Sequence, residues 1–150
     1  MRTVDRATAR ATLERVFAAA ADVERWPTFL PHYRWVTALE RRPSGMLVEM
    51  AARRPFGPLA WPTWWVSQME SDPVRRRIRY RHVRGITTGM EVEWRVDGRD
   101  GEVNVEIVHD WHGPPWPWIG PLVAGWVIGP VFIRGIASRT LAGVCRQAER

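Results

Sequence analysis

Between residues 33 and 111 the sequence alternates between apolar and polar residues in six segments that are separated by short turns. Successive side chains of a β-strand point to opposite faces, so this alternation predicts strands with one covered face and one face toward water. The short turns place consecutive strands side by side, which predicts an antiparallel meander. Such a sheet needs a cover for its apolar face. The predicted strands are residues 33–40, 46–53, 63–70, 76–84, 90–97 and 103–111.

Helical periodicity is found at the two ends of the chain. Residues 12–26 carry an apolar face, and Thr12 is positioned as the cap of this short helix. A weak β pattern precedes it at residues 3–9. Residues 131–149 carry an apolar stripe and predict an amphipathic helix that covers one face of the sheet. These elements predict an α+β fold in a single domain of 150 residues.

Residues 114–133 contain no charged side chain, and twenty uncharged residues match the length of a membrane-spanning helix. Eight of the twenty are Pro or Gly. A proline inside a helix costs about 3 kcal/mol, and unpaired backbone groups are not tolerated in hydrocarbon. The stretch therefore predicts a loop and a kinked helix start that lean over a cavity or touch a membrane surface. Trp116 and Trp118 are equally compatible with a dimer contact, so either a monomer or a homodimer is predicted.

All 22 basic residues are arginines, and the formal net charge is +6. Four of them share the outer face of one predicted strand and have two interpretations. They can pair with Glu91 and Glu93 across a hairpin, or they can dock an acidic acyl carrier protein or an anionic membrane surface. Nucleic-acid recognition is not expected, because no known binding module fits and the tryptophans fall on the covered faces. The four arginines are Arg75, Arg77, Arg79 and Arg81.

The sequence shows no sign of export or of metal chemistry. Cys145 is the only cysteine, which excludes an internal disulfide, and the best N-terminal apolar run, residues 16–21, is too short for a secretory signal. His109 and His112 lie three positions apart and face opposite sides of a strand, which argues against a metal site. With no phosphate-binding or dinucleotide motif, no cofactor is expected. The predicted location is cytoplasmic or peripheral to the membrane.

Five segments span nearly the whole chain: "ATLERVFAAAADVERWPTFLPHY", "WVSQMESDP", "GMEVEW", "VEIVHDW" and "VFIRGIASRTLAGVCRQAE". In this order they resemble the START-related lipid-transfer superfamily, also called SRPBCC, in its polyketide cyclase/dehydrase and coenzyme-Q-binding-like branch. The resemblance implies a helix-grip fold, in which a curved antiparallel sheet wraps around a long C-terminal helix and encloses an apolar cavity. In such a fold, residues 114–133 would form the loop and helix start over the cavity mouth.

The resemblance also implies roles for individual residues. Trp26 and Tyr33 match an aromatic wall and a phenol of the aromatase/cyclases in this branch. Ser67 matches a hydroxyl, and Trp94 matches a tryptophan. The branch has an arginine two positions after this serine, where this chain has Met69. A thioether cannot donate a proton or stabilise an enolate, so the resemblance supports ligand binding and leaves enzymatic ring closure open.

The covered faces of the predicted strands supply the candidate site. Tyr80, His82 and His109 fall on this face, where a neutral imidazole beside a phenol could transfer protons. The competing interpretation is a buried histidine held by a backbone carbonyl or a tyrosine hydroxyl. The candidate catalytic residues are Tyr33, Ser67 and His109. The predicted wall comprises Trp26, Phe29, Tyr33, Trp65, Ser67, Met69, Tyr80, His82, Met90, Trp94, His109, Trp111 and Trp126.

The predicted function is the binding of a hydrophobic small molecule that is polyketide-, quinone- or lipid-like. A pocket of this kind is mostly apolar, with a few polar groups that orient the ligand. Two classes of protein remain open. One is a cyclase-like protein that assists ring closure and dehydration, and the other is a carrier that works at a membrane surface without catalysis.

Overall fold

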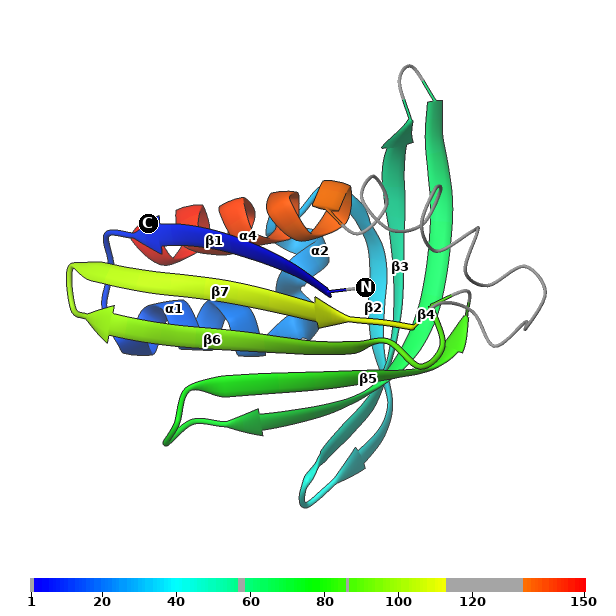
Figure 1. Ribbon diagram of the computed structural model, residues 1–150, viewed down its shortest axis with the longest axis horizontal. Helices are drawn as coiled ribbons and strands as arrows, with labels where there is room; N and C mark the ends of the chain where they lie inside the picture. The colour runs from blue at the N-terminus through cyan, green and yellow to red at the C-terminus, as the bar shows by residue number, and fades with distance from the viewer. Residues whose placement is uncertain (1, 57–58, 86, 113–133) are drawn as a thin grey trace.

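The computed structural model describes residues 2–56, 59–85, 87–112 and 134–150. In this part of the chain, seven strands form one antiparallel sheet in the order β1-β7-β6-β5-β4-β3-β2 (Figure 1). The strands are β1 (Arg2–Ala9), β2 (Tyr33–Arg42), β3 (Gly45–Phe56), β4 (Leu59–Asp72), β5 (Arg77–Gly85), β6 (Glu91–Arg99) and β7 (Glu102–Asp110). The helices are α1 (Leu13–Ala21), the 3-10 turn η1 (Val23–Arg25), α2 (Trp26–Phe29) and α4 (Arg134–Glu149).

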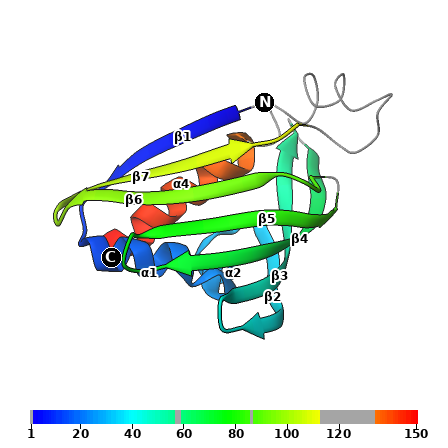
Figure 2. The same cartoon turned by 60° about the horizontal axis from the view of Figure 1, so that its bottom comes forward.

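The sheet bends strongly and wraps around helix α4. Figures 1 and 2 show β3 at a steep angle to β6 and β7, with α1 and α4 on the same side of the sheet. Helix α4 packs against β1, β3, β7 and α1. Ile136, Leu141 and Val144 form the buried stripe of this helix, as its apolar periodicity predicted. The predicted α+β helix-grip architecture is confirmed.

The six predicted strands are all present, and β2 to β7 pair with one another in sequence order. The weak β pattern near the start of the chain also forms a strand, β1, which adds to the free edge of β7. Arg6 of β1 lies opposite Glu106, and their side chains form an ion pair of 2.8 Å. The cap of α1 is as predicted, because Oγ1 of Thr12 accepts a hydrogen bond from the N–H of Arg15 at 3.1 Å.

The alternation also predicts correctly which side chains are covered. On the outer face, Nε of Arg79 donates to Glu93 at 2.9 Å, and Arg81 lies opposite Glu91. Cross-strand pairing is therefore present on the arginine-rich face, and docking of a partner there stays a prediction. The inner, buried set comprises Ile78, Tyr80, His82, Met90, Val92, Trp94, Val96, Val103, Val105 and Ile107.

The uncharged stretch at residues 114–133 lies outside the described residues, and with it lie Trp116, Trp118 and Trp126. No helix in the described part of the chain is long and apolar enough to cross a membrane. Cys145 of α4 is buried and belongs to the core, and burial raises the pKa of its thiol to about 11. It therefore packs as a small apolar side chain.

Strand β5 ends at Gly85, where the pairing with β4 is irregular. The register shifts between Val66 and Ser67, and Gly85 pairs with Trp65. Gly85 has a φ of +99°, and a Cβ added to it would lie 2.5 Å from the carbonyl oxygen of Trp64. Glycine fits both the backbone conformation and the close approach of the two strands. This contact fixes the end of β5 beside Trp65, whose side chain faces the interior.

Candidate functional site

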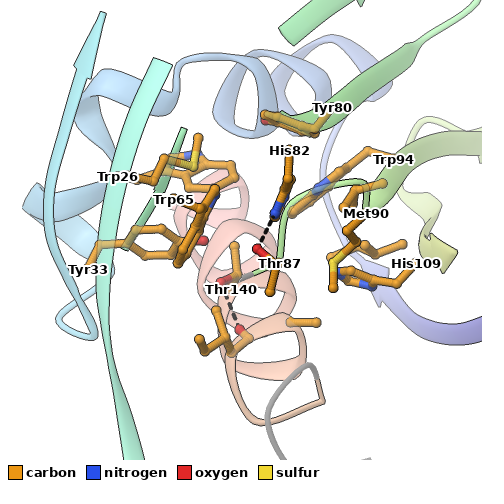
Figure 3. A pocket seen from close by; sticks show the side chains of 15 residues that line it. Trp26, Tyr33, Trp65, Tyr80, His82, Thr87, Met90, Trp94, His109 and Thr140 are labelled. Carbon is orange, nitrogen blue, oxygen red and sulfur yellow. Dashed lines mark hydrogen bonds between the residues drawn. The ribbon is translucent and has the colours of Figure 1, made fainter. Parts of the chain in front are cut away.

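A cavity lies between the inner face of the sheet and helix α4 (Figure 3). Its wall draws on α2, on strands β2 to β7, on the turn between β5 and β6 and on the first half of α4. The described residues that line it include no arginine and no carboxylate, so the polar groups that they supply are hydroxyls, imidazoles and indole N–H groups. They are Trp26, Tyr33, Met50, Trp65, Tyr80, His82, Thr87, Met90, Val92, Trp94, Ile107, His109, Ile136, Ala137 and Thr140.

The cavity is narrow. Its volume is about 70 Å³, whereas pockets that enclose drug-sized ligands measure about 300–1,000 Å³. Met50 and Met90 line the cavity with long, flexible side chains. Methionine changes its conformation to fill irregular gaps more easily than other apolar residues. A ligand with two or more rings therefore requires side chains of the wall to move when it enters.

Four aromatic side chains form one side of the wall. Tyr33 meets Trp26 and Trp65 edge to face, with ring centroids 5.2 and 6.2 Å apart. Trp26 also approaches Trp94, at 5.8 Å between centroids. Nε1 of Trp26 donates to the carbonyl of Ala19 at 3.1 Å, which satisfies its only donor. These contacts fix the rings in place and make this side of the cavity aromatic and apolar.

His82 is held in place on two sides. Its ring stacks on Trp65 at 5.7 Å with an interplanar angle of 6°, and its Nδ1 lies 2.6 Å from the hydroxyl oxygen of Thr87. Figure 3 shows this hydrogen bond at the centre of the cavity wall. Burial, with a smaller effect of His109, lowers the pKa of His82 to about 3. His82 is therefore neutral at physiological pH and serves as part of the wall.

On strands β4, β5 and β7, three buried polar atoms have no hydrogen-bond partner among the described residues: the hydroxyl oxygens of Ser67 and Tyr80, and Nδ1 of His109. Tyr80 and His109 line the cavity. Leaving such a group unpaired costs about 1–3 kcal/mol, so these positions are unfavourable for an empty cavity and favourable for a ligand that carries oxygen atoms.

The ionisation states of these groups follow from burial. Burial, with a smaller effect of Tyr33, raises the pKa of Tyr80 well above its usual range. Burial raises the pKa of Tyr33 to about 12, against a smaller opposing effect of Thr140. Burial lowers the pKa of His109 to about 4. At neutral pH the cavity therefore presents uncharged phenols and uncharged imidazoles, which can donate and accept hydrogen bonds.

Helix α4 contributes Thr140, which connects the cavity to His32. The Thr140 hydroxyl donates to the carbonyl of Ile136 at 2.8 Å. Its oxygen lies 2.8 Å from Nε2 of His32, so this nitrogen carries the proton and donates to it. Burial, and then the positive charge of Arg139, lower the pKa of His32 to about 4. His32 is thus a neutral histidine beside the cavity wall.

Eight of the predicted wall residues are brought together around the cavity. Four others are described but do not line it: Ser67 and Met69 are buried on the inner face of β4, Phe29 packs against the core, and Trp111 donates from Nε1 to the carbonyl of Thr88 at 3.2 Å. Trp126 lies outside the described residues. The eight are Trp26, Tyr33, Trp65, Tyr80, His82, Met90, Trp94 and His109.

Sequence reasoning missed seven lining residues. Met50, Val92 and Ile107 have the parity of the covered face, and the apolar stripe of the last helix contains Ile136 and Ala137, so the pattern held enough information to include these five. Thr87 lies in a turn, where no periodicity applies. Thr140 has the helical spacing of the buried stripe, four positions from Ile136 and Val144, but its polar side chain kept it out of the apolar pattern. No group of three or more metal-binding side chains is found among the described residues.

Comparison with known proteins places this arrangement in a family. The family model for polyketide cyclase / dehydrase and lipid transport matches residues 10–133. Among solved structures, the Zhui aromatase/cyclase from Streptomyces sp. R1128 is 22% identical with a TM-score of 0.84, and the alignment covers 100% of this chain and 94% of that one. The protein TTHA0849 from Thermus thermophilus is 18% identical with a TM-score of 0.81, over 99% of this chain and 97% of that one.

A third solved structure is larger than this chain. The di-domain ARO/CYC protein BexL from the BE-7585A biosynthetic pathway is 20% identical with a TM-score of 0.75, over 99% of this chain and 46% of that one. At these identities the likenesses show the fold. No curated protein matches the sequence significantly.

Proposed function

Since the chain belongs to the polyketide cyclase / dehydrase and lipid transport family, we propose that its cavity binds a hydrophobic small molecule with rings and carbonyl or hydroxyl oxygens. The observation that supports this most directly is the pair of unpartnered groups in the cavity wall, the Tyr80 hydroxyl and Nδ1 of His109. In an otherwise apolar wall, such groups orient a ligand by hydrogen bonds. The aromatic rings of Trp26, Tyr33 and Trp65 provide stacking surfaces.

A polyketide- or quinone-like ligand fits these features better than a saturated lipid chain. Ring systems with carbonyl oxygens use both the aromatic wall and the isolated hydrogen-bonding groups. A saturated chain would leave the Tyr80 hydroxyl and His109 unpaired in the bound state. The absence of arginine and carboxylate from the residues that line the cavity also fits an uncharged ligand.

The test uses 2-methyl-1,4-naphthoquinone and the Tyr80→Phe variant. Quinones quench tryptophan fluorescence, so binding is followed through the tryptophans of the wall. We expect Tyr80→Phe to weaken binding by about 5- to 10-fold, the effect of one lost hydrogen bond. Its stability should stay the same or rise by about 1 kcal/mol, because the variant removes a buried hydroxyl that has no partner in the empty cavity.

The matched control is Trp35→Phe. Trp35 is 38% exposed and does not line the cavity, so this variant should bind the quinone as the parent does. A site in the cavity would be contradicted if Tyr80→Phe left naphthoquinone binding unchanged. It would also be contradicted if Trp35→Phe abolished that binding. A loss of stability in Tyr80→Phe would show instead that the hydroxyl has a structural partner.

A second candidate function, ring closure followed by dehydration, is favoured by one observation. A phenol hydroxyl and a neutral imidazole line the same cavity. These are groups that can take up a proton and return it. In such a reaction a proton leaves a carbon next to a carbonyl, and that carbon bonds to a second carbonyl carbon. The second oxygen takes up a proton to become a hydroxyl, and the new C–C bond closes the ring. The hydroxyl then leaves as water with a second proton of the attacking carbon, which forms a C=C bond in the ring.

The electrostatics favour binding over this catalysis. A pKa of about 4 makes His109 a weak base at neutral pH. No described residue brings a guanidinium to the cavity wall to stabilise an enolate, and Met69 stands where the resemblance implies an arginine. The carrier alternative therefore remains open beside the cyclase-like one.

His109→Leu and Tyr33→Phe separate the two alternatives. With a poly-β-ketone thioester as substrate, an enzyme would lose most of its ring-closed product in these variants, which mass spectrometry detects. Its naphthoquinone binding would weaken by no more than the 5- to 10-fold effect of about one lost hydrogen bond. We expect the parent protein to give little product above the uncatalysed reaction, because of the low basicity of His109. A parent rate well above background that falls in His109→Leu would establish catalysis and overturn this expectation.

A further inference from the structure

A second hollow lies between helix α4 and the segment that joins α2 to β2, and we propose that it binds a phosphate group. Its volume is about 540 Å³, and it is lined by arginines from two elements of the fold. We call it the α4 groove and define it by Arg53, Arg139, Arg146 and His32, which sit around the apolar side chains of Leu30 and Ala142. This inference is independent of the function proposed for the cavity.

The backbone brings the arginines together. Arg139 and Arg146 lie seven positions apart on α4, which is two helical turns, so they project from the same face of the helix. Both are exposed and lie off the buried stripe of α4. Arg53 comes from β3, and its N–H donates to the carbonyl of His32 at 2.7 Å, which ties this strand to the opposite side of the groove.

The charges of the groove are not neutralised within the described part of the chain. No carboxylate lines the groove, and none of Arg53, Arg139 and Arg146 forms an ion pair with a described residue. Several arginines elsewhere in the described part of the chain do form ion pairs. Those that pair with a glutamate or aspartate include Arg6, Arg41, Arg42, Arg77, Arg79, Arg95 and Arg99.

The three guanidinium groups that line the groove select the ligand by their chemistry. Guanidinium presents a planar fork of donors that matches phosphate oxygens in pairs. Three positive charges are balanced better by a phosphate dianion than by a carboxylate with a single charge. A groove of about 540 Å³ also has room for a phosphate together with the group that it is attached to.

His32 reports on the charge in the groove. Its Nε2–H is used by Thr140, and the positive charge of Arg139 contributes to lowering its pKa to about 4. A phosphate bound to Arg139 would offset this charge, so the pKa of His32 should rise. Because Thr140 also lines the cavity, the groove and the cavity share one hydrogen-bonded pair of residues.

The experiment is a titration of the full chain with inorganic phosphate, followed by NMR and compared with sodium chloride at the same ionic strength. We expect saturable shifts of the Arg53 and Arg139 signals and a rise in the pKa of His32. Arg139→Gln should weaken phosphate binding by about 10-fold, because a hydrogen bond to a charged group is lost. Arg139→Lys should weaken it less, since the charge is kept and the fork is lost.

Arg99→Gln is the matched control. It removes the same charge from an exposed arginine that pairs with Glu102 outside the groove. This variant should bind phosphate as the parent does. Absence of saturable shifts, or an equal loss of affinity in Arg99→Gln and Arg139→Gln, would overturn the proposal, because either result means non-specific attraction to a basic protein.

Two further arms identify the source of the phosphate. Glycerol 3-phosphate tests a soluble phosphomonoester, and sedimentation with phosphatidylcholine vesicles, with and without phosphatidic acid, tests a lipid headgroup. If the protein binds glycerol 3-phosphate or the phosphatidic acid vesicles, and Arg139→Gln weakens that binding, the result supports the proposed site and identifies the source of the phosphate. Failure of inorganic phosphate and of both arms would refute it.

Discussion

At about pH 5 the protein is expected to be several kcal/mol less stable toward unfolding than at about pH 7.5. The pKa values of His32 and His109 are lowered to about 4, and that of His82 to about 3, chiefly by burial. In the unfolded chain each imidazole titrates near pH 6.5. Below that pH the unfolded state binds more protons than the folded state, so acid favours unfolding.

The size of the effect follows from the same shifts. The stabilisation is complete above pH 6.5 and is lost as the pH falls toward the folded pKa values. For each fully buried histidine, the free energy of unfolding falls by about 1.4 kcal/mol for each pH unit of acidification in this window. At about pH 5 the three together cost about 4–6 kcal/mol, less where solvent reaches the partly exposed His109. The free energy of unfolding of a small domain is only about 5–15 kcal/mol in total. A loss of this size would therefore remove a large part of the stability of the folded state.

Urea unfolding at a series of pH values measures this dependence. The slope of the unfolding free energy against pH gives the number of protons taken up on unfolding. His82→Gln should lower that number by about one, whereas His112→Gln, at an exposed position, controls for the removal of a histidine as such. A free energy of unfolding that stays flat between about pH 7 and pH 5 would show that folding does not lower the pKa values of the three histidines.

The Gly85→Ala substitution is expected to destabilise the fold by about 2–5 kcal/mol. Two effects add. The φ of +99° is strained for any residue with a Cβ, and that Cβ would lie 2.5 Å from the carbonyl oxygen of Trp64. The carbonyl belongs to β4 and cannot rotate away without breaking the pairing of β4 with β5. The neighbouring Trp65 would then move, so naphthoquinone binding should fall as well.

Gly89→Ala separates the two effects. Gly89 has a similar φ of +90°, but a Cβ at this position would have no atom within 4 Å. Its substitution should cost only the backbone strain, about 1 kcal/mol. The difference between the two variants in thermal or urea unfolding therefore measures the clash. Equal losses in Gly85→Ala and Gly89→Ala would mean that β4 and β5 separate easily at this point.

The periodicity of the sequence was sufficient for most of the fold because one face of the sheet is fully covered. Residues such as Ile78, Tyr80 and Trp94 could be assigned to the inner face by parity alone, and the structure buries all three. The weak pattern of β1 has a physical explanation. Its inner face is only partly apolar, and its stability depends on pairing with β7.

The candidate site was less accessible to the sequence, because parity identifies a face and not the extent of a cavity along a strand. Ser67 has the same parity as Trp65, yet only Trp65 lines the cavity. Thr87 was missed since its role depends on how the β5–β6 turn folds back to His82. His32 lies just before β2, where no periodicity applies, so its contact with Thr140 was not predictable.

The pairing of β1 with β7 has a consequence for how the chain acquires its structure. Arg6 and Glu106, which hold the two strands together, are 100 positions apart in the sequence. During synthesis β1 emerges first and has no partner until β7 has followed, while β2 to β6 can pair locally as they appear. Closure of the sheet by its first strand is thus expected to be a late event, and such long-range pairing slows folding. Until then the edge of β7 can pair with neighbouring chains. The protein is therefore most prone to aggregate before β1 has paired, when several newly made copies lie close together.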